Sequence, residues 1–289
     1  MRHATIRPVS ARDARSRTAG TLYLVGTPIG NLGDMTDRAR ETLAAVDVVA
    51  AEDTRRTGAL LKRFGIAARM LSLHEANERE RTGELLEILR SGRDVAVVSD
   101  AGMPGLSDPG FRLVRACVEA GIDVRVVPGP SAAIAALVVS GLPTDRFVFE
   151  GFLPRRAAER RRRLVALAED PRTIVLFESP KRVAATLQQA GEILGDRRVA
   201  VARELTKLHE EVLRGTIAEV LPSLRDLKGE VVVVVEGRGE PAAPDLDAMV
   251  EEARALIAAG MRTREAATSV ARRHGATANE IYRALVISR

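Results

Sequence analysis

The 289-residue sequence contains one cysteine, Cys117, and four histidines. A single cysteine excludes a disulfide framework within the chain, and no cysteines and histidines show the spacing of a zinc site. Cys117 lies in a helical apolar pattern and is interpreted as a core residue. These absences predict a cytoplasmic protein without a metal centre.

Long apolar runs and aromatic residues are also scarce. Nowhere do 18 apolar residues follow one another, which excludes a membrane-spanning helix. Residues 1–19 carry five arginines but no apolar segment, so they do not resemble a secretory signal and are predicted to form a disordered basic leader. The absence of tryptophan and the presence of only two tyrosines and six phenylalanines disfavour base stacking on an aromatic platform.

Basic residues are in excess, with a net charge of +5 and a sequence pI near 9.9. Such a balance permits an anionic partner without requiring one. Six arginines gather between Arg155 and Arg163, and only Glu159 opposes them. This cluster is either a solvated helix face or a surface that contacts phosphates, and the sequence favours neither.

Short β-branched runs alternate with helical patterns from residue 21 onward, which predicts an α/β fold with largely parallel strands. The predicted strands are 21–26, 47–51, 69–73, 94–99, 123–127, 146–150, 172–177, 198–203 and 230–236. The predicted helices between them are 36–46, 54–64, 77–91, 109–120, 131–140, 157–169, 180–194 and 216–226.

Composition divides the chain into successive parts. After the leader, residues 20–143 form one predicted α/β domain and residues 144–240 a second. The stretch 239–245 has the composition of a linker. Residues 245–289 are helical throughout in pattern (246–259, 263–274 and 277–286), which is typical of a small helix-turn-helix extension, although other small helical caps share this pattern.

Three glycine-rich loops follow predicted strands of the first domain. The loop after residue 25 has neither the G-x-G-x-x-G spacing of a dinucleotide site nor a phosphate-binding lysine, which disfavours a hydride-transferring enzyme. The loops at 99–110 and 127–133 would meet it at the carboxyl edge of the sheet and form a pocket. Asp100 would face the ligand, whereas Asp108 and Ser131 could instead cap helices.

Charged blocks follow three further strands. Glu52–Arg56 combines acids with arginines and is equally consistent with surface ion pairing. Phe177–Arg182 and Ala202–Glu211 gather charges of both signs at the edge of the second domain. Charge opposite an apolar first domain is what a substrate cleft would need.

Together these blocks resemble the tetrapyrrole methylase superfamily, the class III S-adenosylmethionine methyltransferases with two α/β domains facing one cleft. Within it they are similar to the small-subunit ribosomal RNA methyltransferase I family. The resemblance covers about residues 20–240 and rests on seven blocks in the family's order: Leu24-Val-Gly-Thr-Pro-Ile-Gly-Asn-Leu-Gly-Asp34, Ala51-Glu-Asp-Thr-Arg55, Ser99-Asp-Ala-Gly-Met-Pro-Gly-Leu-Ser-Asp-Pro-Gly110, Val127-Pro-Gly-Pro-Ser-Ala132, Phe149-Glu-Gly-Phe-Leu-Pro154, Phe177-Glu-Ser-Pro180 and Arg203-Glu-Leu-Thr-Lys-Leu-His-Glu-Glu211.

The resemblance implies S-adenosylmethionine-dependent methylation of the 2′-hydroxyl of a cytidine in the decoding region of 16S rRNA. It also implies the 16S rRNA or the 30S subunit as partner, and a homodimer. The cofactor-binding positions that it implies are Ile29, Ser99, Asp100, Ala101, Pro104, Ser131, Ala132, Glu178 and Leu205. Ser99-Asp-Ala101 departs from the Gly-Asp-Pro of the superfamily. We expect RNA contacts from Arg55, Arg155, Arg156, Arg160 and Arg203.

Methyl transfer to a ribose hydroxyl requires positioning, and a general base would add roughly 10²–10⁴-fold. Candidate bases are Asp53, His209 and, as the preferred catalytic residues, Glu204 and Lys207. Lys207 would act as a base only if its pKa fell toward neutrality, and it could equally contact an RNA phosphate. Two other functions stay open: methylation of a tetrapyrrole or another small molecule, and non-catalytic binding of rRNA during assembly.

Overall fold

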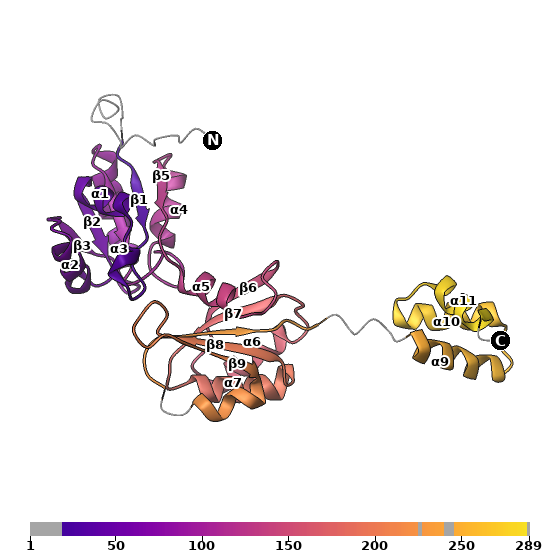
Figure 1. The fold of residues 1–289 in the computed structure, drawn as a ribbon. Coiled ribbons are helices and arrows are strands. Elements are labelled where there is room, and N and C mark those ends of the chain that lie inside the picture. Colours follow the sequence, from indigo (N-terminus) through magenta and orange to yellow (C-terminus); the bar gives the residue numbers. More distant parts are fainter. Residues whose placement is uncertain (1–18, 225–226, 240–245, 288–289) are drawn as a thin grey trace, which may run out of the picture. The chain divides into compact units, whose positions relative to one another are not determined.

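The computed structural model describes residues 19–224, 227–239 and 246–287 (Figure 1). The predicted leader, apart from Ala19, and residues 240–245 of the predicted linker lie outside the described residues. The described part contains two five-stranded sheets and a group of three helices, which confirms the predicted fold class. None of the described helices is long and apolar enough to cross a membrane.

The first sheet is entirely parallel, with strand order β3-β2-β4-β1-β5. Its strands are β1 (Leu22–Val25), β2 (Val48–Ala51), β3 (Met70–Ser72), β4 (Val95–Val98) and β5 (Val124–Val127). The two strands β2 and β4 are buried at every position because helices cover both faces of the sheet.

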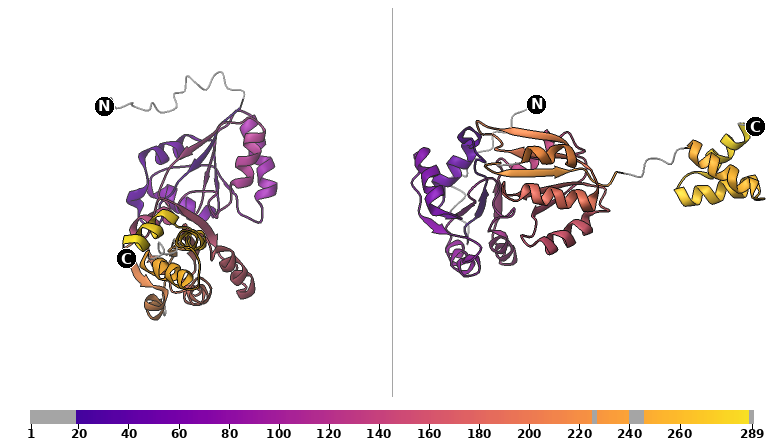
Figure 2. Two further views of the ribbon diagram at one scale, coloured as in Figure 1. Left: turned by 90° about the vertical axis from the view of Figure 1, so that its right-hand side faces the viewer. Right: turned by 90° about the horizontal axis from the view of Figure 1, so that it is seen from below.

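Two separate cores fill the two faces of this sheet, and helices lie on both of its faces (Figure 2). The short 3₁₀ helix η2 (Leu32–Asp34) precedes α1 (Asp37–Ala45), which packs with α2 (Thr54–Arg63) on one face. On the other face lie α3 (Glu78–Arg90) and α4 (Phe111–Glu119), where Cys117 is fully buried as predicted.

The second sheet is mixed, with strand order β6-β7-β10-β8-β9. Its strands are β6 (Phe147–Phe152), β7 (Thr173–Glu178), β8 (Arg198–Arg203), β9 (Glu211–Thr216) and β10 (Val231–Val235). Only β6 and β7 are parallel; β10 runs antiparallel to both of its neighbours, and β9 runs antiparallel to β8. The prediction of largely parallel strands was therefore wrong for this domain.

Strand β9 was not predicted at all, because this half-exposed edge strand has a mixed sequence with no clear alternation. The helix expected over 216–226 is limited to the short α8 (Ile217–Val220) followed by the 3₁₀ helix η3 (Leu221–Leu224). Helices α6 (Ala157–Leu167) and α7 (Val183–Leu194) cover one face of the sheet (Figure 1).

Helix α5 (Ala132–Val139) packs on the other face of the second sheet. Its residues Ala136 and Leu137 share a core with Ala200 on β8 and Val234 on β10. Because α5 follows β5 directly, it joins the loop edge of the first sheet to the second sheet. The predicted domain boundaries near residues 143 and 240 stay a prediction.

The three remaining helices form a compact unit of their own: α9 (Leu246–Ala258), α10 (Thr263–His274) and α11 (Ala278–Ile287). Their core includes Ala253, Val270 and Ile281. The three predicted helix ranges are confirmed to within a residue at each end, because strong amphipathic patterns set them.

Candidate active site

Two loops of the first sheet meet backbone to backbone. The amide of Gly26 donates to the carbonyl of Val127 at 2.9 Å. A Cβ on Gly26 would lie 2.6 Å from the Cα of Gly129, and a Cβ on Gly129 would lie 2.9 Å from the Cα of Gly26. Side chains are thus excluded at both positions, which explains why each loop has a glycine there.

A third loop, which follows β4, is joined to the first by a pair of backbone hydrogen bonds. Thr27 donates to Gly102 at 2.9 Å, and Gly102 donates back to Thr27 at 3.1 Å. The hydroxyl of Ser99 donates to the carbonyl of Ala101 at 3.1 Å within the same turn. The three loops predicted to meet at the carboxyl edge therefore do meet, and they form one rigid wall.

A cavity of about 350 Å³ lies between this wall and the second sheet. That volume is in the range of small-molecule sites. Its lining is mostly apolar and includes Met103, Phe177 and Val232, with the carboxyl of Asp108 at its edge. Five predicted cofactor-binding residues line it: Ile29, Ala101, Ser131, Ala132 and Glu178.

A second cavity of about 250 Å³ adjoins the first and shares Ile29, Ala101 and Glu230 with it. It is more polar: Asp100 and Arg56 come from the first domain, and Lys207 comes from the second. Polar groups of opposite charge thus surround a space directly beside the apolar cavity.

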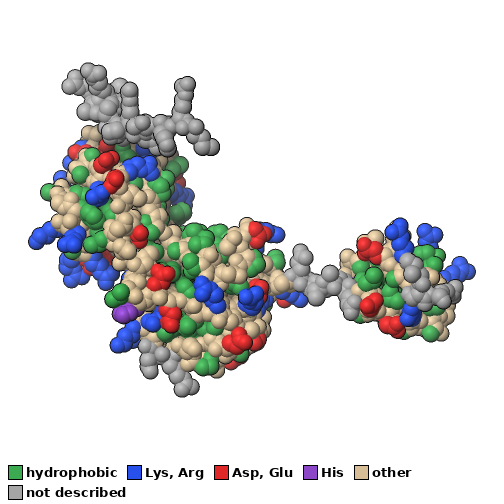
Figure 3. Space-filling view, in the orientation of Figure 1, with side chains coloured by type: hydrophobic (Ala, Val, Ile, Leu, Met, Phe, Trp, Pro, Cys, Tyr) green, Lys and Arg blue, Asp and Glu red, His purple; other side chains and the backbone are tan. Residues whose placement is uncertain are grey.

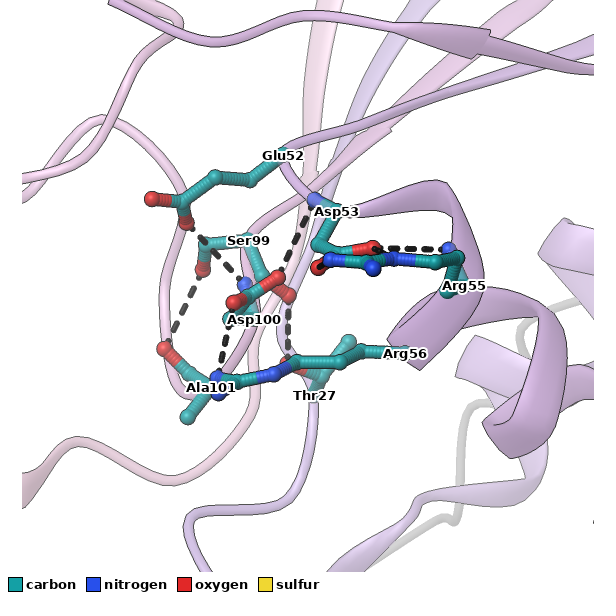
Figure 4. A network of polar contacts seen from close by, with 8 residues as sticks. All are labelled: Thr27, Glu52, Asp53, Arg55, Arg56, Ser99, Asp100 and Ala101. Atoms are coloured by element: carbon teal, nitrogen blue, oxygen red, sulfur yellow. Dashed lines mark hydrogen bonds and ion pairs between the residues drawn. The ribbon is translucent and has the colours of Figure 1, made fainter.

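Asp100 is the centre of the polar network at this edge (Figure 4). Its Oδ1 accepts from the amide of Asp53 at 3.1 Å, and its Oδ2 accepts from Arg56 at 2.9 Å. The amide of Asp100 donates to Glu52 at 3.2 Å. Asp100 therefore connects the loop after β4 to the start of α2, and it brings Arg56 to the second cavity.

Asp53 begins α2 and is held by Arg55. Hydrogen bonds from the Arg55 side chain and then from its backbone amide hold the pKa of Asp53 far below its usual range. A carboxylate with such a low pKa accepts a proton poorly, so Asp53 does not suit the role of a general base.

Asp108 has the opposite electrostatic environment. Burial, followed by repulsion from Glu52 and Asp100, raises the pKa of Asp108 to about 6. The ionised form of Asp108 is therefore costly in this environment. A bound cation would relieve that cost, so the cavity suits a positively charged ligand.

Lys207 reaches across from the second domain. A Cβ on Gly30 would lie 2.6 Å from the Cγ of Lys207, so the lysine stem rests against the first glycine loop. Its Nζ donates to Glu204 at 2.9 Å and to Glu230 at 3.1 Å. The loop that holds it is strained, because Glu204 and Thr206 both have positive φ angles, of 49° and 69°.

The condition for a base role of Lys207, a pKa that falls toward neutrality, is not met. Burial lowers the pKa of Lys207, but the hydrogen bonds to Glu204 and Glu230 and the attraction of both carboxylates raise it, and the net shift is upward. Lys207 is therefore a cation at neutral pH. Its hydrogen bond in turn, against a smaller opposing effect of burial, lowers the pKa of Glu204, so neither group suits the role of a general base.

The carboxylate of Glu178 makes its hydrogen bonds within the second domain. It is 2% exposed and accepts hydrogen bonds from the amide of Ser179 at 2.8 Å, from Arg182 at 3.0 Å and from Thr186 at 2.7 Å. These bonds tie the end of β7 to the start of α7. We therefore assign the Glu178 side chain a structural role, although the residue lines the first cavity.

Several other predicted residues lie away from both cavities. Ser99, Pro104 and Leu205 are buried and line neither cavity, so they support the loops instead. His209 is exposed and also lines neither. Fewer residues therefore line the two cavities than were predicted from the sequence.

The predicted RNA-binding arginines differ in their surroundings. Arg155 and Arg156 are exposed at the start of α6, and Arg55 is exposed on α2. Arg160 is only 8% exposed and donates to Gln189 of α7 at 2.8 Å, while Arg203 pairs with Glu211 at 2.5 Å. We leave Arg160 and Arg203 out of the RNA surface, because Arg160 is buried and Arg203 partly buried, whereas Arg55, Arg155 and Arg156 are exposed.

Sequence reasoning missed Glu230 and Val232, which line the site from the start of β10. Ligands were expected only after strand ends, as in a parallel sheet. Because β10 runs antiparallel to β7 and β8, its first residues lie at the edge where those strands end. Glu230 and Val232 could have been assigned to the site only if the antiparallel direction of β10 had been known.

Comparison with known proteins agrees with this geometry. Residues 21–221 match the family model described as Tetrapyrrole (Corrin/Porphyrin) Methylases. The solved structure of the methyltransferase CobJ has a TM-score of 0.58 at 21% identity, covering 76% of this chain and 95% of that one. This likeness confirms the fold.

Curated relatives are similar over most of the chain. The ribosomal RNA small subunit methyltransferase I of Synechocystis sp. is 47% identical over 268 residues, which is 91% of this chain and 96% of the relative. The protein of the same name from Thermotoga maritima is 51% identical over 221 residues, which is 76% of this chain and 99% of that relative. The chain therefore belongs to the tetrapyrrole methylase family and, within it, to the ribosomal RNA small subunit methyltransferase I family.

Proposed function

We propose that this protein transfers a methyl group from S-adenosylmethionine to the 2′-hydroxyl of a cytidine in small-subunit ribosomal RNA. S-adenosylmethionine is the methyl donor of this family. The observation that carries the proposal is the pair of adjoining cavities, one apolar with an acidic edge and one lined by Asp100, Arg56 and Lys207. Two reactants can lie side by side in such an arrangement.

The first cavity fits the cofactor. S-adenosylmethionine supplies, when bound, an electrophilic methyl group on a positively charged sulfonium. The apolar lining from Met103, Phe177 and Val232 suits an adenine ring and excludes water, and the raised pKa of Asp108 identifies a carboxyl that gains from a nearby cation. We propose that backbone groups of Ala101 and Ala132 contact the ligand from the glycine-rich wall.

The second cavity is proposed to hold the acceptor ribose. Lys207, as a cation fixed between Glu204 and Glu230, would donate a hydrogen bond to the nucleotide and not remove its proton. Positioning of the hydroxyl against the methyl group would supply most of the acceleration. As the new C–O bond forms and the sulfonium C–S bond breaks, the hydroxyl proton would pass to solvent water. Exposed Arg55, Arg155 and Arg156 are proposed to contact phosphates.

The function is tested by incubating the protein and radiolabelled S-adenosylmethionine with 30S subunits, naked 16S rRNA and a tetrapyrrole precursor in parallel. Label is expected on a cytidine 2′-oxygen in one or both RNA samples, located by its resistance to alkaline hydrolysis. Label on the tetrapyrrole alone would replace the proposal with small-molecule methylation. Binding of RNA without any affinity for S-adenosylmethionine would instead identify an assembly factor.

Asp108→Asn removes the titratable carboxyl from the cavity and keeps nearly the same side-chain shape. As the pH falls from about 7.5 to 5, the wild type should lose affinity for S-adenosylmethionine roughly 3- to 10-fold, because Asp108 gains a proton near pH 6 and no longer attracts a cation. The variant should bind more weakly at pH 7.5 but show no such pH dependence. Calorimetric titrations at both pH values measure this.

The stability of the ligand-free protein gives the control. A carboxyl whose folded pKa is raised contributes stability that is present below its unfolded pKa, near 4, and is lost as the pH rises through about 6. Asp108→Asn should therefore raise the unfolding midpoint at pH 8 relative to the wild type, and less so at pH 4. An equal effect at both pH values would contradict a raised pKa for Asp108.

We also propose that two copies of the chain associate through the open edge of the first sheet. Strand β5 lies at that edge with Val126 exposed, and α4 packs beside it. Phe111 and Val118, on one face of α4, are 67% and 66% exposed. The double variant Phe111→Asp with Val118→Asp should sediment as a monomer while the wild type sediments as a dimer; a monomeric wild type would contradict the proposal.

A further inference from the structure

The three-helix unit carries a surface that the catalytic fold does not use. It lies outside residues 21–221, which the family model covers. The relative from Thermotoga maritima aligns over 99% of its own length but over only 76% of this chain. Nearly the whole of that relative thus aligns with about three quarters of the present chain, and the helical unit lies outside the residues that the family model matches.

The connection between α10 and α11 has the form of a helix-turn-helix. Three residues separate the helices, and the first of them, Gly275, is left-handed with a φ of 66°. This conformation ends α10 abruptly and lets α11 start in a new direction. A short turn that contains glycine is characteristic of nucleic-acid-binding helix pairs.

Charge is divided unevenly within the unit. Helix α9 carries three acids and one arginine, whereas residues 262–287 carry five arginines and two acids. Most of the basic side chains that Figure 3 shows on this unit lie along its α10–α11 side. The helix pair thus presents positive charge while α9 presents negative charge.

Ion pairs show which arginines are already engaged. Arg254 pairs with Glu251 on α9, and Arg273 pairs with Glu252 and so fixes one flank of α10 against α9. The arginines that remain make no ion pair with any residue that the structure describes, and all are exposed: Arg262, Arg264, Arg272 and Arg283.

The spacing of these arginines places them on the exposed sides of α10 and α11. At 100° per residue, Arg264 lies on the opposite flank of α10 from Arg273 and hence away from α9. Arg272 follows two helical turns later on the exposed face. On α11, Arg283 lies four residues after Asn279, and both are opposite the buried Ile281.

We propose that the exposed basic surface of α10 and α11, which includes Arg264, Arg272, Asn279 and Arg283, binds the phosphate backbone of ribosomal RNA and holds the enzyme on its substrate. The partner is argued from charge: guanidinium groups that pair with none of the described acidic residues, on a helix-turn-helix, match a polyanion. The inference rests on the proposed rRNA substrate. A second attachment point raises the local concentration of the target at the active site without changing the chemistry.

The test compares full-length variants in binding to naked 16S rRNA over a series of salt concentrations. The triple variant Arg264→Ala, Arg272→Ala and Arg283→Ala should lower the slope of log K against log salt by about 2 to 3, since each phosphate contact contributes roughly 0.7–0.9. This corresponds to about 100-fold weaker binding near 0.1 M salt. Arg254→Ala, on α9 of the same unit, is the matched control and should leave the slope unchanged.

Methyl transfer and cofactor binding separate this inference from the proposed function. The triple variant should bind S-adenosylmethionine as the wild type does and keep its kcat, with a raised KM for rRNA. An unchanged salt slope, with methyl transfer by the wild type intact, would overturn the inference alone. Loss of affinity for 30S subunits but not for naked rRNA would identify a protein partner and would also overturn it. A wild type that methylates no RNA would overturn the proposed function.

Discussion

Gly26→Ala is expected to abolish measurable binding of S-adenosylmethionine. The added Cβ would lie 2.6 Å from the backbone of Gly129 and 2.7 Å from the Sδ of Met103. The backbones at Gly26 and Gly129 cannot move apart without breaking the hydrogen bond between Gly26 and Val127. Separation of the loops after β1 and β5 displaces the wall of the first cavity. Overpacking of this kind costs about 1–3 kcal/mol of stability, and we expect cofactor affinity to fall by at least about 100-fold.

Gly83→Ala provides the matched control. Gly83 lies in the middle of α3, is exposed, and has no atom within 4 Å of the position that a Cβ would occupy. The same substitution should therefore raise the unfolding free energy by about 0.5–1 kcal/mol, because alanine favours helix over glycine. Calorimetric titration and denaturant unfolding of both variants measure the difference. Normal cofactor affinity in folded Gly26→Ala would show that the approach of the two loops is unnecessary.

The first domain could be predicted from sequence because each of its elements is defined locally. Short apolar runs rich in valine predicted β2 and β4, and glycines marked the loops that follow β1 and β5. A parallel sheet then brings those loops to one edge whatever the details of packing. Ser131 was found in this way, whereas Ile29 and Ala101 were implied by the family resemblance, and all three line the first cavity.

The second domain resisted prediction because the direction of a strand is a tertiary property. The apolar run Val231–Val235 looks the same whether it runs parallel or antiparallel to its neighbours, and the sheet is completed by β9, which is a weak edge strand. The sequence also did not predict which charged side chains are buried. Arg160 belongs to a basic run in sequence, yet the helical period turns it inward toward Gln189.

The buried hydrogen bonds of Glu178 change its expected role from binding the cofactor to stabilising the fold. Glu178→Ala should destabilise the protein by about 3–5 kcal/mol, a large part of the 5–15 kcal/mol that is usual for a folded domain. The change would remove the carboxylate that pairs with Arg182, whose guanidinium would keep its hydrogen bond to the carbonyl of Leu153, and would leave the buried hydroxyl of Thr186 without its carboxylate acceptor. Chemical denaturation followed by circular dichroism measures the loss.

Two further variants distinguish a structural carboxylate from a ligand for the cofactor. Glu178→Leu combined with Arg182→Met removes both members of the ion pair, and it should recover much of the stability that Glu178→Ala loses, because no unpaired charge remains. Glu178→Gln keeps one acceptor oxygen and should remain folded. If the carboxylate only anchors α7, folded Glu178→Gln should bind S-adenosylmethionine within about threefold of the wild type. If the carboxylate contacts the cofactor directly, loss of that charged contact should cost about 1.5–3 kcal/mol, which is roughly 10- to 150-fold in affinity. Retained affinity together with lowered stability would establish that Glu178 shapes the cavity through β7 and α7 without contacting the ligand through its charge.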